Sequence, residues 1–304
     1  MSNTLQIIGS MILACVPAII WGIFFYIKRP EDRRFSSTTF LAGGIAVFPI
    51  LLYKLSWSYF PWLNAFRFAE KYREDLIGFT DITVLSLSVI ITFMMVGVIE
   101  EVMKYLAIKG VDNNKLLSID DAIEFFIIGA LGFSFTENIL YFYNIWVTEG
   151  AGNLFIPFLF RAGFSTFAHV MFSGILGYYY GVAHFAKPIL QEEIRANRKH
   201  WTVLYHKILS IRKDRLFHQE KISEGLLIAV GLHAIFNIFL EMKLTYLIVP
   251  FLVGGYLALT YMFTVKENHK NYGKLLKGER NHIMNPHKNY FHCLKRFLPK
   301  SGSN

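Results

Sequence analysis

The chain has 304 residues, of which 54% are hydrophobic and only 17% are charged, with a formal net charge of +9. About a quarter of the residues in an ordinary soluble domain are charged, so this composition excludes that class and indicates a polytopic α-helical membrane protein. The positive charge does not indicate nucleic-acid binding, because the basic residues lie between apolar stretches and in the tail. The two cysteines, Cys15 and Cys293, are too few for a disulfide framework or a cysteine zinc site.

Apolar stretches of roughly 20 residues predict about seven transmembrane helices in an all-α fold. We interpret the first stretch as a span and not as a cleaved signal peptide, because no basic region precedes it and it is long enough to cross a bilayer. The fifth stretch is longer than one crossing needs, which predicts a tilted or interrupted helix. In chain order the stretches are 5–27, 38–59, 82–108, 120–146, 154–186, 225–243 and 245–265.

The distribution of lysine and arginine predicts how the spans are oriented, since cytosolic loops carry an excess of both residues. Residues 28–34 contain four of them, residues 187–222 contain nine and residues 266–304 contain nine, whereas residues 147–153 contain none. We therefore expect the N-terminus outside and the C-terminus in the cytosol. The protein is then a multi-pass integral protein, and the cell (plasma) membrane is the expected location.

The sequence predicts one transmembrane domain over 1–265, with a motif-bearing core at 82–243 and a basic cytosolic tail at 266–304. The cytosolic basic loop at 187–222 and the tail either contact anionic lipid or only set the topology. Residues 60–81 alternate aromatic and charged side chains, which is typical of an amphipathic interfacial helix on the outer side or of a solvated connector.

Four consecutive spans carry ionisable or amide side chains within apolar sequence. A charge at bilayer depth is rare unless it is paired or functional. Each side chain alone could be structural: Glu100 and Lys104 lie four residues apart and could form an ion pair, and Arg161 could extend to the outer interface. Together, three carboxylates and two histidines can satisfy one another only by converging, which predicts one site for acid–base chemistry, metal binding or ion passage. The residues are Glu100, Glu101, Lys104, Glu137, Asn138, Arg161, Ser165, His169, Ser173, His233 and Asn237.

The expected spans also predict the depth of this site. At 1.5 Å per residue, His233 lies roughly 12 Å from the cytosolic end of its span and Glu100 roughly 27 Å from the outer end. These positions favour the cytosolic half. Glu137 lies about 25 Å from Asp120, at the start of the fourth span. Its depth agrees with that of His233 and Glu100 only if the fourth helix is tilted or its charged start lies outside the hydrocarbon.

Four of these segments resemble the motifs of one protein family. The segment "EEVMK" (100–104) resembles the EExxK motif of the PrsW family of intramembrane proteases, and "FSFTEN" (133–138) resembles its FxxxEN motif. The segment "RAGFSTFAHVMFSGILGYYYG" (161–181) resembles the family's helix with arginine and histidine, and "HAIFN" (233–237) resembles its closing motif. The four motifs occur in family order, within roughly 82–240.

The resemblance implies an intramembrane endopeptidase in the lipid bilayer, which hydrolyses peptide bonds of membrane proteins or membrane-anchored peptides. By analogy with the wider superfamily, which includes the CAAX prenyl endopeptidases and bacteriocin-processing membrane proteases, it implies that Glu100 is the general base. Glu101 then supports Glu100, while His233 and Asn237 stabilise the oxyanion.

The resemblance does not decide which residue assists the general base, because Glu137 stands where the prenyl endopeptidases have a histidine. Either Glu137 or His169 is this partner. The metal question stays open too. Glu100 or Glu101 together with Glu137, His169 and His233 offers up to four ligands, and three ligands with a water would make a catalytic zinc site. The three that we expect are Glu137, His169 and His233. A metal-free route needs only the buried glutamate and oxyanion donors, and the superfamily analogy favours it. The competing hypotheses are a non-catalytic membrane scaffold of the same fold and a proton-coupled transporter.

Overall fold

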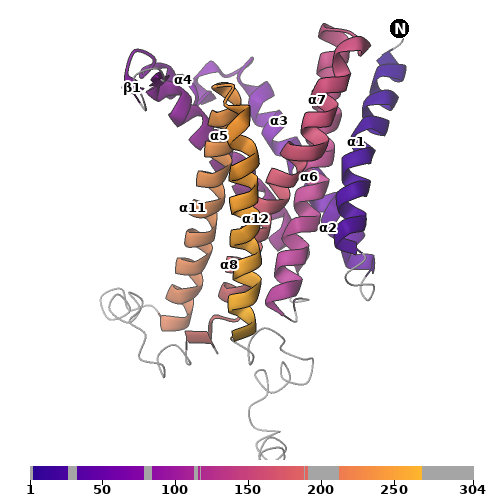
Figure 1. Ribbon diagram of the computed structural model, residues 1–304. Helices are drawn as coiled ribbons and strands as arrows, with labels where there is room; N and C mark the ends of the chain where they lie inside the picture. The colour runs from indigo at the N-terminus through magenta and orange to yellow at the C-terminus, as the bar shows by residue number, and fades with distance from the viewer. Residues whose placement is uncertain are drawn as a thin grey trace, which may run out of the picture.

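The computed structural model describes residues 3–26, 33–78, 84–112, 116, 118–187, 189–190 and 212–268 as a bundle of long helices (Figure 1). Most of the predicted basic loop and tail, at 191–211 and 269–304, lies outside the described residues. The helices are α1 (Asn3–Tyr26), α2 (Arg33–Ile45), α3 (Val47–Ser56), α5 (Leu87–Asp112), α6 (Ile119–Thr148), α7 (Phe155–Phe160), α8 (Thr166–His184), α11 (Lys213–Glu241) and α12 (Thr245–Asn268).

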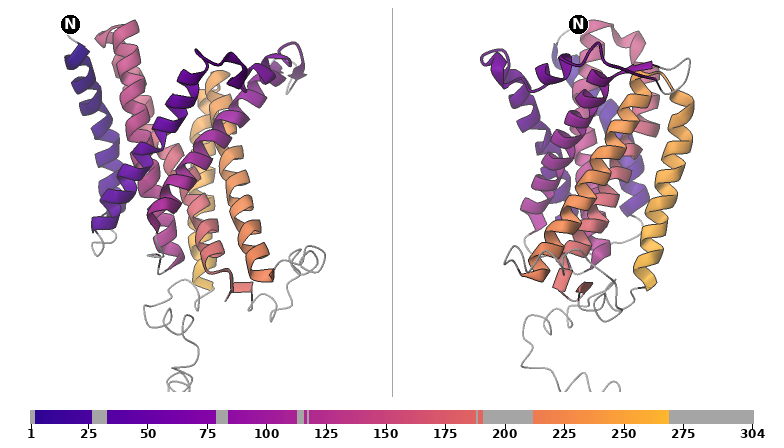
Figure 2. Two further views of the ribbon diagram at one scale, coloured as in Figure 1. Left: turned by 180° about the vertical axis from the view of Figure 1, so that it is seen from behind. Right: turned by 90° about the vertical axis from the view of Figure 1, so that its left-hand side faces the viewer.

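Helices α6 and α8 form the centre of the bundle. They pack against each other; α1 and α2 pack on α6, whereas α11 and α12 pack on α8. Helix α5 packs on α11 and α2, and α1 and α11 lie on opposite sides of the molecule (Figure 2). This arrangement places the four motif-bearing segments next to one another.

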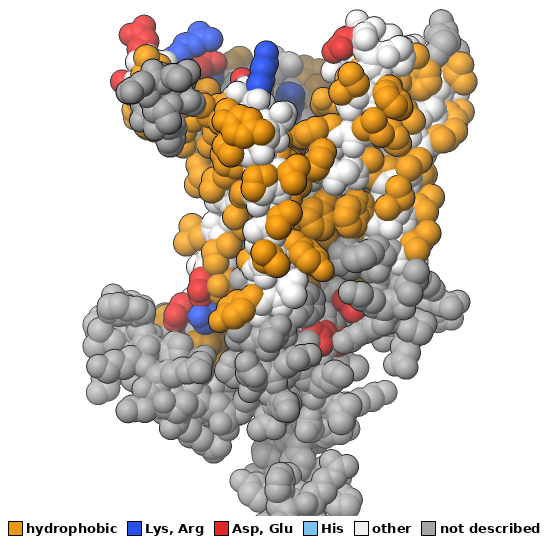
Figure 3. Space-filling model, in the orientation of Figure 1, with side chains coloured by type: hydrophobic (Ala, Val, Ile, Leu, Met, Phe, Trp, Pro, Cys, Tyr) orange, Lys and Arg blue, Asp and Glu red, His pale blue; other side chains and the backbone are white. Residues whose placement is uncertain are grey.

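Five helical segments in the described part of the chain are long and apolar enough to cross a membrane. Figure 3 shows hydrophobic side chains over the middle of the bundle, with charged side chains toward its two ends. These findings confirm an all-α integral membrane protein. Helix α5 is long enough but carries five charged residues, and the apolar part of α12 is shorter, so the count of seven stays a prediction, as does the orientation. The five segments are Asn3–Ile23, Ser37–Ser56, Ile119–Thr148, Ala151–His184 and Lys213–Glu241.

The predicted interfacial helix at 60–81 is wrong as a continuous helix. The segment contains a single 3₁₀ turn (Pro61–Leu63), the short helix α4 (Arg67–Glu70) and strand β1 (Leu76–Gly78), which pairs antiparallel with β2 (Val84–Ser86). Asn64 interrupts the helix, because its backbone is extended and its side chain accepts a hydrogen bond from the amide of Phe66 at 3.0 Å. Since β2 occupies residues 84–86, α5 begins only at Leu87.

The sixth helix begins earlier than predicted, and this changes the depth of the site. Helix α11 starts at Lys213 instead of 225, so His233 lies about 30 Å from its start and about 12 Å from its end. Glu137 lies about 27 Å from the start of α6, where Ser118 caps the helix by accepting a hydrogen bond from the amide of Asp121. The two residues therefore agree in depth, and a location in the cytosolic half no longer follows.

Glycines allow α2 and α6 to cross in close contact. A Cβ atom on Gly43 would overlap the carbonyl of Gly129, and one on Gly132 would overlap the carbonyl of Phe40. In a bilayer, helices associate through packing more than through the hydrophobic effect, so small residues at a crossing determine how close two helices come.

We expect Gly132→Ala to lower the thermal unfolding temperature of the protein in detergent. The added methyl group meets backbone, and overpacking of this kind costs about 1–3 kcal/mol. The matched control is Gly22→Ala, because nothing lies within 4 Å of a Cβ at Gly22; alanine there favours the helix by up to about 1 kcal/mol. An unfolding temperature of Gly132→Ala at or above that of Gly22→Ala would contradict the close crossing.

Candidate active site

Lys104 is the central side chain of the polar cluster. It is fully buried, and its Nζ donates a hydrogen bond to Glu101 Oε1 at 2.7 Å and lies 2.9 Å from His169 Nδ1. The ammonium group also lies 4.4 Å from the centre of the Phe133 ring, within cation–π range. The ion pair that the sequence suggested between Lys104 and Glu100 is not the one formed; Lys104 pairs with Glu101, three residues away.

The contacts of Lys104 determine which nitrogen of His169 carries the proton. An ammonium group only donates, so His169 Nδ1 accepts, and Nε2 then carries the proton. His169 Nε2 lies 3.0 Å from Glu137 Oε2 and donates to it. The same carboxylate oxygen lies 2.7 Å from an Arg161 guanidinium nitrogen. Arg161 therefore turns inward to the cluster, and does not extend to the interface.

A second group of polar side chains holds Arg161 from α6 and α8. Arg161 Nε donates a hydrogen bond to Asn138 Oδ1, and Asn138 Nδ2 contacts the hydroxyls of Ser134 at 3.4 Å and Thr166 at 3.3 Å. Ser134 donates to Thr166 at 3.0 Å. The guanidinium carbon of Arg161 lies 4.3 Å from the centre of the Tyr141 ring. Arg161 is thus fixed by a hydrogen bond to Asn138, an ion pair with Glu137 and an aromatic face.

His233 joins the two adjacent glutamates of α5. Its Nδ1 lies 2.9 Å from Glu101 Oε1 and donates to it, which leaves the Nε2 lone pair free. Nε2 lies 3.7 Å from Glu100 Oε2, and this carboxylate oxygen is buried with no hydrogen-bond partner among the described residues. Two electron-pair donors therefore approach each other inside a buried cluster, which is a place for a proton or a cation.

Three side chains meet the spacing of a metal site. Donor atoms of Glu100, His169 and His233 all lie within 4.8 Å of one another. One carboxylate and two imidazoles are a ligand set that catalytic zinc uses. The set predicted from the sequence differs in one member, since it had Glu137 in place of Glu100.

The side chains fit a zinc ion in their chemistry. Glu100 Oε2 and His233 Nε2 are open donors, and Glu101 orients His233 through Nδ1, as acceptors behind metal-bound histidines commonly do. His169 is already bonded at both nitrogens, so ligation through His169 requires it to exchange its contact with Lys104 or with Glu137.

Comparison with known proteins identifies the family. The sequence model of the PrsW family of intramembrane metalloproteases matches residues 31–265. The chain belongs to this family. Comparisons with curated proteins and with solved structures give no match.

Family membership confirms the resemblance seen in the motifs and makes the chain an intramembrane protease that acts on membrane protein substrates within the bilayer. The match is wider than the motif-bearing region and includes α2, α3 and most of α12. The description of the family as metalloproteases does not favour the metal-free route that the superfamily analogy suggested.

In this PrsW-family protease, Asn237 is the one predicted site residue that does not join the hydrogen-bonded cluster. It is half-buried, one turn after His233, and makes no hydrogen bond within the described part of the chain.

Ser173 is fully buried, and its hydroxyl has no hydrogen-bond partner among the described residues. Ser134 and Thr166 were missed, although Ser134 lies four residues before Asn138 and thus on the same helical face.

A π-helical segment explains why Thr166 was missed. Residues Arg161–Ser165 form a π-helix between α7 and α8, in which the amide of Thr166 bonds to the carbonyl of Arg161. Hydrogen bonds five residues apart shift the helical register, so Arg161 shares its contacts with Thr166 and not with Ser165. The interruption predicted for the long fifth stretch occurs at this segment.

Trp21 of α1 supports the π-helical segment. Its indole Nε1 donates a hydrogen bond to the carbonyl of Ala162 at 3.0 Å, and its ring stacks on Phe167 with 4.8 Å between the ring centres. Helix α1 precedes the region that matches the family, so a helix outside that region holds the segment that carries Arg161.

We expect Trp21→Phe to lower the rate of cleavage of a transmembrane peptide by a few-fold, because it keeps an aromatic ring against Phe167 but removes the hydrogen bond to Ala162, worth about 0.5–1.5 kcal/mol. Cleavage in detergent micelles, at equal folded protein, measures the effect. Trp62→Phe is the matched control, since Trp62 is 77% exposed. Equal rates for the two variants would show that Trp21 does not position the site.

Proposed function

We propose that this protein is a metal-dependent intramembrane endopeptidase whose zinc ion is held by Glu100, His169 and His233. The observation that carries the proposal is the buried, unbonded Glu100 Oε2, which faces the open Nε2 of His233 at 3.7 Å. A buried carboxylate oxygen without a partner is unfavourable unless a ligand completes it. The membership in a family of metalloproteases points to a metal as that ligand.

The charge of the cluster supports a cation at this position. Glu100, Glu101 and Glu137 carry three negative charges, whereas Lys104 and Arg161 carry two positive charges and neutral histidines add none. One negative charge is therefore left over in an apolar surrounding, where an uncompensated charge is costly. A bound cation would remove this imbalance.

A zinc ion bound there would lower the pKa of a water molecule and polarise the peptide carbonyl. The residues of the chain prepare the site for hydrolysis. Glu101 accepts a hydrogen bond from Nδ1 of His233, which fixes the tautomer of the neutral ring whose lone pair is on Nε2. Lys104 neutralises Glu101, and Arg161 holds Glu137 against His169.

Hydrolysis consumes one water: its oxygen bonds to the peptide carbonyl carbon, the carbon–nitrogen bond breaks, and a proton passes to the leaving amine. With Glu100 holding the metal, we assign the transfer of this proton to the carboxylate of Glu137. Its side chain is 31% exposed, against 16% for Glu100 and none for Glu101, so it is the least enclosed of the three carboxylates. Asn237, whose amide is unbonded, is the proposed donor to the developing oxyanion.

Glu100→Gln tests the assignment of Glu100. We expect zinc content, measured by elemental analysis of the purified protein, to fall together with the cleavage rate, because an amide is a poor replacement for a carboxylate ligand. If Glu100 is instead the general base, as the superfamily analogy suggested, the rate falls about 10²–10⁴-fold while zinc stays bound. The control is Glu149→Gln, an exposed carboxylate at the end of α6. A variant with wild-type rate and wild-type zinc would contradict both roles.

Metal removal tests the metal requirement itself. Prolonged dialysis against a chelator should abolish cleavage of a transmembrane peptide, and a stoichiometric amount of zinc should restore it. The metal content is measured in parallel, because a chelator that cannot enter the bilayer leaves a buried ion in place. Full activity in protein that contains far less than one metal ion per chain would overturn the proposal and favour the metal-free route.

A further inference from the structure

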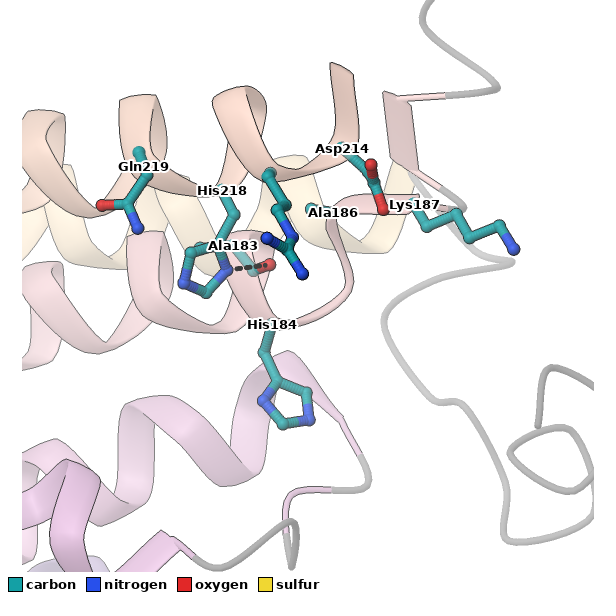
Figure 4. A pocket seen from close by; sticks show the side chains of 8 residues that line it. Ala183, His184, Ala186, Lys187, Asp214, His218 and Gln219 are labelled. Carbon is teal, nitrogen blue, oxygen red and sulfur yellow. Dashed lines mark hydrogen bonds between the residues drawn. The ribbon is translucent and has the colours of Figure 1, made fainter. Parts of the chain in front are cut away.

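A pocket with basic lining lies at the end of the bundle opposite the N-terminus, between the end of α8 and the start of α11 (Figure 4). Its volume of about 470 Å³ is within the range of about 300–1,000 Å³ that small-molecule sites have. Neither the family match nor the proposed protease site accounts for it. The lining residues are Ala183, His184, Ala186, Lys187, Asp214, Arg215, His218 and Gln219.

The walls of the pocket are held in place by packing and by one hydrogen bond. His218 Nδ1 donates to the carbonyl of Ala183 at 2.8 Å, which satisfies a carbonyl in the last turn of α8 (Figure 4). Next to the pocket, Phe217 is fully buried in a cluster with Ala186 and Val182. The pocket therefore joins two helix ends that are fixed relative to each other.

The charge of the pocket is positive. Asp214, its one carboxylate, is neutralised by Arg212, which donates two hydrogen bonds to it through Nε and Nη2. Arg215 and Lys187 form no ion pair with any residue that the structure describes, so their charges are not compensated within that part of the chain. Two further lining residues, His218 and Gln219, follow Arg215 by three and four residues and therefore lie on the same face of α11.

The pocket lies at one end of two candidate membrane spans. Ala151–His184 ends at the pocket and Lys213–Glu241 begins there. A polar pocket where two spans end is reached both from the headgroup layer and from the aqueous side. Basic side chains at this depth attract anionic lipids, by about 1 kcal/mol for each lysine or arginine.

We propose that this pocket binds a phosphate group, supplied by the headgroup of an anionic phospholipid or by free phosphate in solution. Arg215 offers a planar fork of donors that matches phosphate oxygens. Lys187 adds a second positive charge to the lining, although its side chain extends away from the other lining residues in Figure 4. The amide of Gln219 supplies a further hydrogen-bond donor. The neutralised Asp214 does not repel the ligand.

Titration calorimetry on the full-length protein in a neutral detergent tests the proposal. The probes are a short-chain phosphatidylglycerol, a short-chain phosphatidylcholine and inorganic phosphate. We expect saturable binding of phosphatidylglycerol, weakened about tenfold or more in Arg215→Gln, because a charge-assisted hydrogen bond is lost. Lys213→Gln is the matched control: it removes the same charge two residues away, from a side chain that does not line the pocket.

The outcomes separate the two sources of phosphate. Binding of phosphatidylglycerol with no effect of millimolar phosphate identifies a lipid site. Binding of phosphate that competes with the lipid and is weakened by Arg215→Gln identifies a site for free phosphate. Absence of saturable binding by either anion overturns the proposal, and so does an equal loss in Arg215→Gln and Lys213→Gln. Thermal unfolding of each variant in the same detergent shows whether weakened binding reflects a misfolded protein.

Discussion

The geometry of the site depends on one constraint: a charge inside a bilayer has no water to solvate it and must find its partners within the protein. Lys104 meets this constraint through Glu101 on its own helix, His169 on α8 and the ring of Phe133 on α6. The ammonium group is fully buried. Removing one partner of a buried ion pair costs about 3–5 kcal/mol, so this contact fixes α5, α6 and α8 relative to one another.

The same ammonium group sets the protons of both histidines. Lys104 makes His169 accept at Nδ1 and hence donate from Nε2 to Glu137. It also compensates the charge of Glu101, which lets that carboxylate accept the Nδ1 proton of His233. The result is an asymmetric site, in which His233 presents a free lone pair and His169 is bonded at both nitrogens. A metal ion would therefore meet one prepared imidazole and one that must exchange a partner.

The convergence of these residues could be predicted from the sequence, because charges isolated in apolar stretches have only one another as partners. The pairings could not. On a helix, Lys104 can reach either Glu100, four residues before it, or Glu101, three residues before it. The choice depends on His169 and His233, which lie 65 and 132 residues from their partners in the chain. Their positions are a property of the packed bundle, and no local spacing contains that information.

The features that periodicity missed are departures from regular helix geometry. Arg161 and Thr166 share contacts because a π-helical segment lies between them, and the carbonyl of Ala162 in that segment is bonded by Trp21, from another helix. The close approach of α5 to α11 is a second feature that the pattern of side chains does not predict. A Cβ on Gly97 would lie 3.0 Å from the carbonyl of Val230 and 3.6 Å from Cβ of His233. The absence of a side chain at residue 97 thus brings His233 within reach of both glutamates, so a residue with no chemistry of its own helps to set the distances on which the site depends.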